Sequence, residues 1–168
     1  MITRHADDFF AYAKTLDLDF SSATAKAVFV VSPIGFALAE QSARDNRYMQ
    51  MGQVTDAQQA IMEHQQLQTA LRQHCPVICF PGDPNMPDSV FPNNVFATAE
   101  GKFIIGHMRH PVRQKEATRN DIRRFMTEVM QREEIDLSSQ PGICELTGSL
   151  IIDRARGIGF CGLSERCD

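Results

Sequence analysis

Met-Pro-Asp-Ser-Val-Phe-Pro-Asn-Asn-Val-Phe-Ala-Thr, at residues 86–98, alternates polar with apolar residues and contains two prolines. Because proline fixes its own φ angle and pushes the preceding residue toward extended geometry, the stretch predicts a loop that enters a strand. Asp88, Asn93 and Asn94 then lie at the mouth of that strand. Their oxygens form an array of acceptors that suits a planar, donor-rich group such as a guanidinium or a ureide. The alternative interpretation is a tight turn, in which Asn and Asp are ordinary residues.

Helical and strand periodicities alternate on both sides of this stretch, which predicts an α/β fold. On the N-terminal side we expect a short helix around residues 9–16, a buried strand at 27–31, a polar loop at 34–53, a helix from Thr55 to His74 with Thr55 as its N-cap, and a strand at 77–80. On the C-terminal side we expect a hairpin of 95–99 with 102–106, a loop at 107–112, an amphipathic helix at 114–131 with Val129 on its inner face, a connection at 137–143, and a hairpin of 150–153 with 158–162.

A second polar cluster, Glu145-Leu-Thr-Gly-Ser149, directly precedes the second hairpin, as the first cluster precedes the first. A carboxylate at Glu145 suits a cation or a proton transfer, with a pKa set by burial. Taken alone, Glu145 is also consistent with a solvated loop residue. If Asp88 and Glu145 face one pocket, the pair predicts a clamp for a cationic group.

The composition excludes several classes of protein. A net charge of −4 without a long Lys/Arg run argues against a nucleic-acid partner. No apolar run approaches the roughly 18–20 residues that cross a bilayer, and the N-terminus is not a signal peptide. The five cysteines lack the spacing of a disulfide framework, so we expect reduced thiols and a cytoplasmic protein.

Other reactive side chains give weaker signals. His107 and His110 form a His-x-x-His in a loop without a third ligand, so no metal site is expected. Cys144 and Cys161 have no neighbour in sequence that lowers a thiol pKa, although a thiol enzyme that uses one of them stays an alternative. Arg113 belongs either to a solvated basic helix face or to a site for a substrate carboxylate.

The motifs resemble those of a known family. Pro87-Asp-Ser-Val-Phe-Pro-Asn-Asn94 resembles the first substrate motif of the guanidino-group modifying superfamily, which includes arginine deiminase, dimethylarginine dimethylaminohydrolase and the amidinotransferases. Its Phe-Pro-Asn-Asn version is most similar to amidinotransferase-like citrulline-utilisation hydrolases. The resemblance runs from about residue 27 to the last residue, and further matching segments are 31–36, 45–46, 145–150 and 162–166.

The resemblance implies a five-bladed, pentein-like α/β propeller. Residues 25–168 would be the N-terminal part of it, with two to three ββαβ-type blades, and residues 1–24 an accessory segment. It implies Glu145 as a catalytic residue and a substrate-binding set of Asp88, Phe91, Asn93, Asn94 and Ser149. Family chemistry attacks the central guanidino or ureido carbon with a cysteine thiolate, uses a histidine as acid and base, and needs neither metal nor cofactor.

Two departures modify these expectations. Leu146 replaces a glycine, and Asn94 replaces an aspartate, so a neutral ureide such as citrulline suits the pocket better than arginine. The chain also ends at Asp168, before the positions of the family's histidine and nucleophilic cysteine. We therefore expect an N-terminal portion of a hydrolase or amidinotransferase that is inactive alone, with self-association or pairing to a missing half through bare strand edges. The alternative is a non-catalytic, truncated ligand-binding or structural relative.

Overall fold

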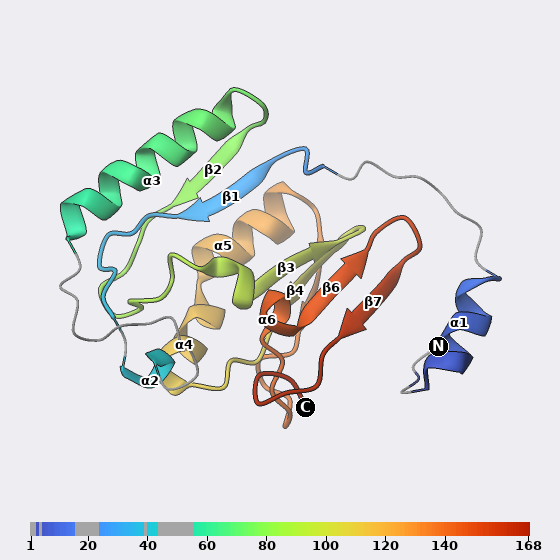
Figure 1. The fold of residues 1–168 in the computed structure, drawn as a ribbon. Helices are drawn as coiled ribbons and strands as arrows, with labels where there is room; N and C mark the ends of the chain where they lie inside the picture. The colour runs from blue at the N-terminus through green and yellow to red at the C-terminus, as the bar shows by residue number, and fades with distance from the viewer. Residues whose placement is uncertain (1–2, 4, 16–23, 39, 44–55) are drawn as a thin grey trace.

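Three separate β-sheets form the framework of the protein (Figure 1). The structure is a computed structural model that describes residues 3, 5–15, 24–38, 40–43 and 56–168. The first helix, α1 (Ala6–Ala13), falls where the periodicity places a helix and lies apart from the sheets in Figure 1. Most of the predicted loop at 34–53 lies outside the described residues, and the short helix α2 (Glu40–Ala43) occupies part of the remainder.

The first sheet pairs β1 (Val28–Val31) with β2 (Val77–Phe80) in parallel, with Val28 opposite Val77. The long helix α3 (Ala57–Arg72) precedes β2 and runs beside this sheet in Figure 1. Both strands and the helix were expected from the sequence. The predicted N-cap was wrong: Asp56 caps the helix, because its side chain accepts hydrogen bonds from the backbone N–H groups of Gln58 and Gln59.

The second sheet has the order β3-β4-β5. Its hairpin of β3 (Phe96–Ala99) and β4 (Lys102–Ile105) confirms the prediction, and Gly101 adopts the positive φ of 65° that the tight turn needs. Strand β5 (Glu133–Asp136), which the sequence did not predict, pairs in parallel with β4.

The single helix predicted at 114–131 is wrong, because the segment is broken. Helix α4 (Pro111–Gln114) already begins inside the predicted loop, and a 3₁₀ turn follows at Lys115–Thr118. Arg119 then takes a non-helical ψ of 87° before α5 (Asn120–Arg124) and a π-helical turn at Phe125–Val129. Val129 is 65% exposed, so its predicted place on the inner face is also wrong.

The third sheet is the predicted C-terminal hairpin of β6 (Leu150–Asp153) and β7 (Ile158–Cys161). A short helix, α6 (Leu146–Ser149), forms most of the second polar cluster, and that cluster directly precedes β6 as predicted. Among the described elements, β3, β4, α5 and β5 alone complete the ββαβ order. The fold is therefore mixed α/β, the described elements form one complete unit of that type, and the number of blades stays a prediction.

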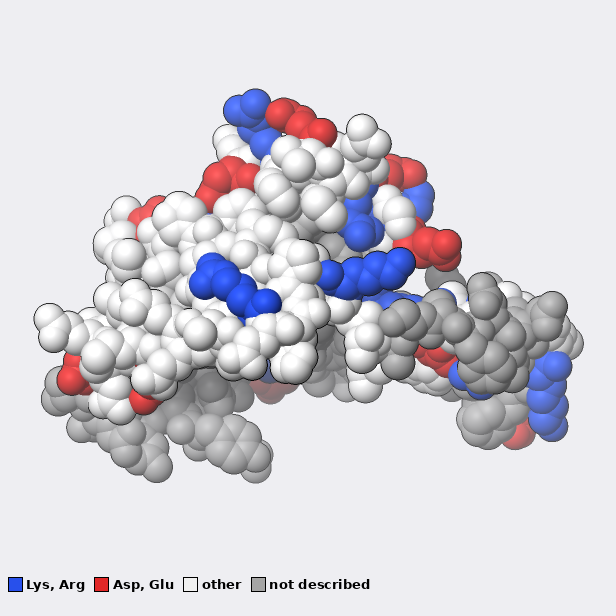
Figure 2. Space-filling view, turned by 90° about the horizontal axis from the view of Figure 1, so that it is seen from above, with Lys and Arg blue, Asp and Glu red and all other residues white. Residues whose placement is uncertain are grey.

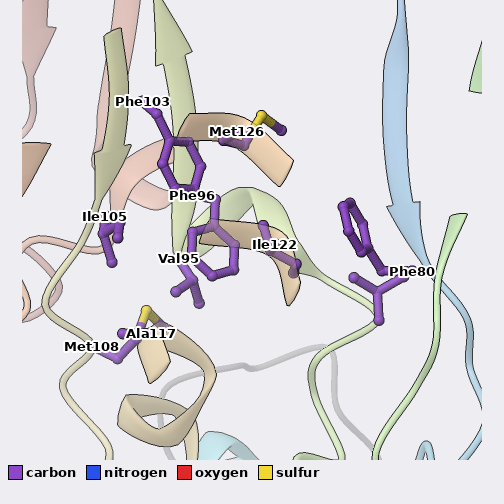
Figure 3. Packing of buried hydrophobic residues seen from close by; sticks show 10 residues of the cluster. Phe80, Val95, Phe96, Phe103, Ile105, Met108, Ala117, Ile122 and Met126 are labelled. Carbon is purple, nitrogen blue, oxygen red and sulfur yellow. The ribbon is translucent and has the colours of Figure 1, made fainter. Parts of the chain in front are cut away.

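The core lies between the second sheet, the helices that follow it, and the first sheet (Figure 3). Phe96 and Phe103 stack with ring centroids 5.5 Å apart, and Phe80 brings β2 into edge contact with Phe125 at 5.6 Å. The buried cluster consists of Val31, Phe80, Val95, Phe96, Phe103, Ile105, Met108, Ala117, Ile122 and Met126. This core fixes the backbone on both sides of the polar stretch at 86–94.

The surface charges are mixed in sign. Figure 2 shows Lys and Arg side chains scattered over the face it displays, with Asp and Glu among them, rather than gathered in one basic patch. Within the described residues, every helix is too short or too polar to span a bilayer.

Candidate active site

The stretch at 86–94 folds as a chain of tight turns that leads into β3. Ser89 N–H donates to the Met86 carbonyl at 3.0 Å, and Phe91 N–H donates to the Asp88 carbonyl at 2.9 Å. A 3₁₀ turn at Pro92–Asn94 follows, with proline at its first position, where no N–H is needed. The loop that enters the strand is therefore itself built from tight turns, and the role of its polar side chains stays a prediction.

Arg113, from α4, inserts its guanidinium into this loop. Nη2 donates to the Phe91 carbonyl at 2.9 Å and to the Asp88 carbonyl at 3.4 Å, while Nη1 donates to Asn94 Oδ1 at 3.4 Å. Arg113 is only 7% exposed. The sequence predicted that the side chains of Asp88, Asn93 and Asn94 suit a guanidinium. Arg113, a residue of the chain itself, bonds one of them, Asn94, and otherwise bonds backbone carbonyls of this loop.

Glu116 holds the other edge of the same guanidinium. Arg113 Nε donates to Oε1 and Nη2 donates to Oε2, both at 2.9 Å, in a bidentate pair that is buried on both sides. Burial lowers the pKa of Arg113, but the hydrogen bonds to Glu116 and the charges of Glu116, Asp88 and Glu145 more than offset it and leave that pKa raised. Burial raises the pKa of Glu116, and Arg113 opposes the rise.

Asp88 is the most enclosed of the predicted site residues, with 2% exposure. Its Oδ2 accepts a hydrogen bond from Ser42 Oγ. Its Oδ1 is buried and accepts no hydrogen bond from the described residues. A buried carboxylate oxygen without a donor is costly, which makes Oδ1 a distinctive feature of this loop.

Glu145 is 3% exposed and sits at the start of α6. Oε1 accepts from the Arg109 backbone N–H at 3.2 Å, and Oε2 accepts from Arg166 Nε at 2.6 Å. Glu145 N–H also donates to the Arg166 carbonyl at 2.9 Å. The carboxylate is therefore clamped by the C-terminal segment, and the solvated-loop interpretation of Glu145 is wrong.

The two polar clusters meet through their neighbours. Asn93 Nδ2 donates to Thr147 Oγ1 at 2.6 Å, and Thr147 Oγ1 donates to the Asn93 carbonyl at 2.7 Å, across 54 positions of sequence. The negative charges of Asp88 and Glu145 both contribute to the raised pKa of Arg113. The structure thus brings together the clusters that the sequence paired, and the roles of their residues stay predictions.

The remaining predicted residues lie at the edge of this arrangement. Phe91 is 45% exposed, and its ring makes an edge contact with that of Phe36, with the ring centroids 6.0 Å apart. Ser149 Oγ is buried without a hydrogen-bond partner among the described residues. A cleft of about 250 Å³ between β1, β3 and β6 is lined by Asn93 and Thr147 but by neither Asp88 nor Glu145. The sequence analysis assigned no role to Glu116, Ser42 or Arg166. The one local signal for the Arg113–Glu116 ion pair was their separation of three positions on a helix.

The histidine and thiol alternatives can be compared with the contacts of His107, Cys144 and Cys161. His107 Nδ1 donates to the Gly142 carbonyl at 2.7 Å, and the described His, Cys, Asp and Glu residues form no group of three suited to a metal ion. Burial raises the pKa of the Cys144 thiol, and burial with a hydrogen bond to Cys167 raises that of Cys161 to about 11.

These raised pKa values predict slow alkylation of Cys144 and Cys161 by iodoacetamide at about pH 7, because the thiolate is the nucleophile. The rate at Cys161 should rise about tenfold per pH unit below its pKa. Mass spectrometry of each cysteine across a pH series measures this, with exposed Cys79 as the internal reference. Alkylation of Cys161 faster than Cys79 at neutral pH would restore the thiol-enzyme alternative.

Comparison with known proteins places this geometry in context. The family model for N,N dimethylarginine dimethylhydrolase, eukaryotic, matches residues 32–168. A search of curated protein sequences finds no match.

Solved structures share the fold at low sequence identity. The arginine dihydrolase ArgZ from cyanobacteria, without ligand, superposes with a TM-score of 0.69 at 18% identity, over 83% of this chain and 20% of its own. The N-terminal domain of ArgZ, covalently bound to a reaction intermediate, gives 0.67 at 16% identity over 83% of this chain and 49% of that domain. DDAH from Pseudomonas aeruginosa, a mutant complexed with citrulline, gives 0.65 at 19% identity, over 85% of this chain and 52% of its own. The chain thus spans about half the length of the single-domain structures it matches.

Proposed function

Because the chain belongs to the N,N dimethylarginine dimethylhydrolase family, and with it to the guanidino-group modifying superfamily, we propose that it forms the substrate-holding part of a hydrolase for guanidino or ureido C–N bonds. The nucleophile would be a cysteine outside this chain, so the chain alone would bind and not turn over substrate. Residues 25–168 would form part of a five-bladed α/β propeller, with residues 1–24 as an accessory segment.

One observation carries the proposal: the acceptors of the 86–94 loop and Glu145 each hold a guanidinium of the chain, from Arg113 and Arg166. Two such groups near each other indicate that this region is chemically matched to planar, donor-rich nitrogen groups. Asp88 Oδ1 adds a buried acceptor that has no donor from the described residues. We assign Asp88 and Glu145 to the substrate nitrogen atoms, with Phe91, Asn93 and Ser149 as supporting residues.

The orientation of Asn94 favours a ureide. Its Oδ1 accepts from Arg113 Nη1, so the Nδ2 amide is the group that Asn94 would offer to a ligand, as a donor. A guanidinium carries only hydrogen-bond donors, so it would place a donor against the Asn94 amide. The carbonyl oxygen of a citrulline-like ureide would instead accept a hydrogen bond from that amide. We therefore propose that citrulline-like ligands bind this chain more tightly than arginine. An amidinotransferase would use the same chemistry, with an amine in place of water as the molecule that receives the amidino group.

Calorimetric titration of the chain with citrulline and with arginine tests this function. We expect Glu145→Gln and Asp88→Asn each to weaken citrulline binding about tenfold or more, since each removes a charged acceptor worth about 1.5–3 kcal/mol. Asn94→Asp should reverse the preference toward arginine, because it replaces a donor with a charged acceptor.

Glu128→Gln is the matched control, since Glu128 is exposed and pairs only locally with Arg124. Thermal unfolding of each variant separates lost binding from lost folding. Absence of binding by the folded wild-type chain would favour the structural relative, in which Arg113 and Arg166 fill the acceptors permanently.

A further inference from the structure

Two cysteines near the end of the chain lie in direct contact. Cys161, at the end of β7, and Cys167 have their sulfur atoms 3.1 Å apart and share a hydrogen bond. Cys161 is exposed, whereas Cys167 is 6% exposed. The separation of six positions gave no signal in the sequence, and the turn between them creates the contact.

That turn is held by a backbone ladder. Ser164 N–H donates to the Cys167 carbonyl at 2.9 Å, and Cys167 N–H donates to the Ser164 carbonyl at 3.2 Å. Cys167 also pairs with Cys144 in an isolated antiparallel bridge. The two sulfur atoms therefore need to approach by about 1 Å to reach a bonded distance of about 2.05 Å, and the backbone around them is already fixed.

We propose that Cys161 and Cys167 form a reversible intramolecular disulfide, a redox modification site at the closed turn of residues 162–166. The oxidant is a low-molecular-weight disulfide such as oxidised glutathione. One protein thiolate attacks it and releases one glutathione thiol, and the second protein thiolate attacks the mixed disulfide and releases the other. Two protein thiols and one small disulfide become one protein disulfide and two small thiols, which balances electrons and protons.

The bridge acts on the residues around Glu145. Arg166 directly precedes Cys167, and its guanidinium and carbonyl bind the Glu145 carboxylate and N–H. Tying Cys167 to β7 shortens the free segment that carries Arg166, so the oxidised form holds Arg166 on Glu145 more firmly. This consequence concerns the backbone and does not depend on which ligand the site takes.

The test is equilibration of the purified chain in buffers of graded reduced-to-oxidised glutathione ratio, followed by acid quench and peptide mapping. An equilibrium measurement is used because the raised pKa of Cys161 slows its attack. We expect loss of two of the five thiols, a single linked peptide pair containing Cys161 and Cys167, and full reversal by dithiothreitol. Hydrogen exchange at the Glu145 amide should be several-fold slower in the oxidised chain.

Single cysteine variants show which two residues form the disulfide. Cys161→Ser should form no intramolecular disulfide, whereas Cys144→Ser and Cys79→Ser should bridge as the wild type does. A wild-type map that links Cys144 to Cys167, that shows disulfides between chains, or that shows no bridge at any ratio would overturn the proposal. The wild-type map gives its answer even if a variant fails to fold.

Discussion

Replacing Glu116 with alanine is expected to lower the free energy of unfolding by about 3 kcal/mol, among the largest losses available in this chain. The Arg113 guanidinium would stay buried with carbonyl and amide oxygens but without its bidentate carboxylate. Removing one member of a buried pair costs more than the pair contributes, because an uncompensated charge is left out of water. Urea denaturation followed by circular dichroism measures the loss.

Two further variants make this result interpretable. Glu128→Ala, which breaks an exposed pair with Arg124, should change stability by less than about 0.5 kcal/mol. The double variant Arg113→Met/Glu116→Leu should lose less stability than Glu116→Ala, since it removes both members of the buried pair. If Glu116→Ala costs under about 1 kcal/mol, the site is more hydrated than the structure shows and Arg113 is free to leave the loop.

Replacing Ile105 with alanine is expected to cost about 2–5 kcal/mol. Ile105 is fully buried at the end of β4, directly opposite Phe96 in the hairpin, so truncation leaves a cavity in the main core. The residue also precedes Gly106, whose N–H donates to the Val95 carbonyl at 2.8 Å and closes the hairpin against the polar loop. Loss of Ile105 should therefore loosen the loop as well as the core, and urea denaturation gives the magnitude.

Ile151→Ala is the matched control, because it removes the same atoms from strand β6, where Ile151 is 72% exposed. Its cost should stay below about 1 kcal/mol, the range of strand propensity alone. An equal loss at both positions would mean that the face of β6 is covered in solution, and it would contradict the exposure that the structure gives.

Local signals in the sequence were sufficient for the hairpins. Gly101 and Gly157 both adopt positive φ at the turns where the sequence placed them, and alternating apolar residues on each side fix the register. The two strands of the first sheet were likewise predicted, at 27–31 and 77–80, but their parallel pairing was not. The polar clusters were found because proline, asparagine and a carboxylate next to apolar strands are locally recognisable.

Strand β5 and the break at Arg119 were not predicted, and both involve ion pairs formed in the tertiary structure. Strand β5 reads Glu-Glu-Ile-Asp, a poor strand composition, and it forms because Lys102 pairs with Glu133 while Arg123 pairs with Glu134 and Asp136. The break at Arg119 has a similar cause, since its guanidinium reaches the Pro81 carbonyl at 2.9 Å and Asp121 at 2.6 Å. Apart from Asp121, two positions from Arg119, these partners come from other segments of the chain, so no local pattern shows them.

The occupancy of the site by Arg113 was missed for the same reason. The sequence showed acceptors that suit a guanidinium and, separately, an arginine on a basic helix face. It took the fold to place that arginine among those acceptors, with Glu116 as its counter-charge.

The hairpin of β6 and β7 also affects how the chain behaves at high concentration. Its exposed Ile151 and Phe160 lie on a sheet of two strands, whose outer backbone groups offer a template for another copy. Repulsion between copies comes from a net charge of −4 at pH 7 and vanishes near the isoelectric point of about 5.7. We therefore expect colloidal stability to be lowest in mildly acidic, high-salt buffers, where exposed strand edges would meet without an electrostatic barrier.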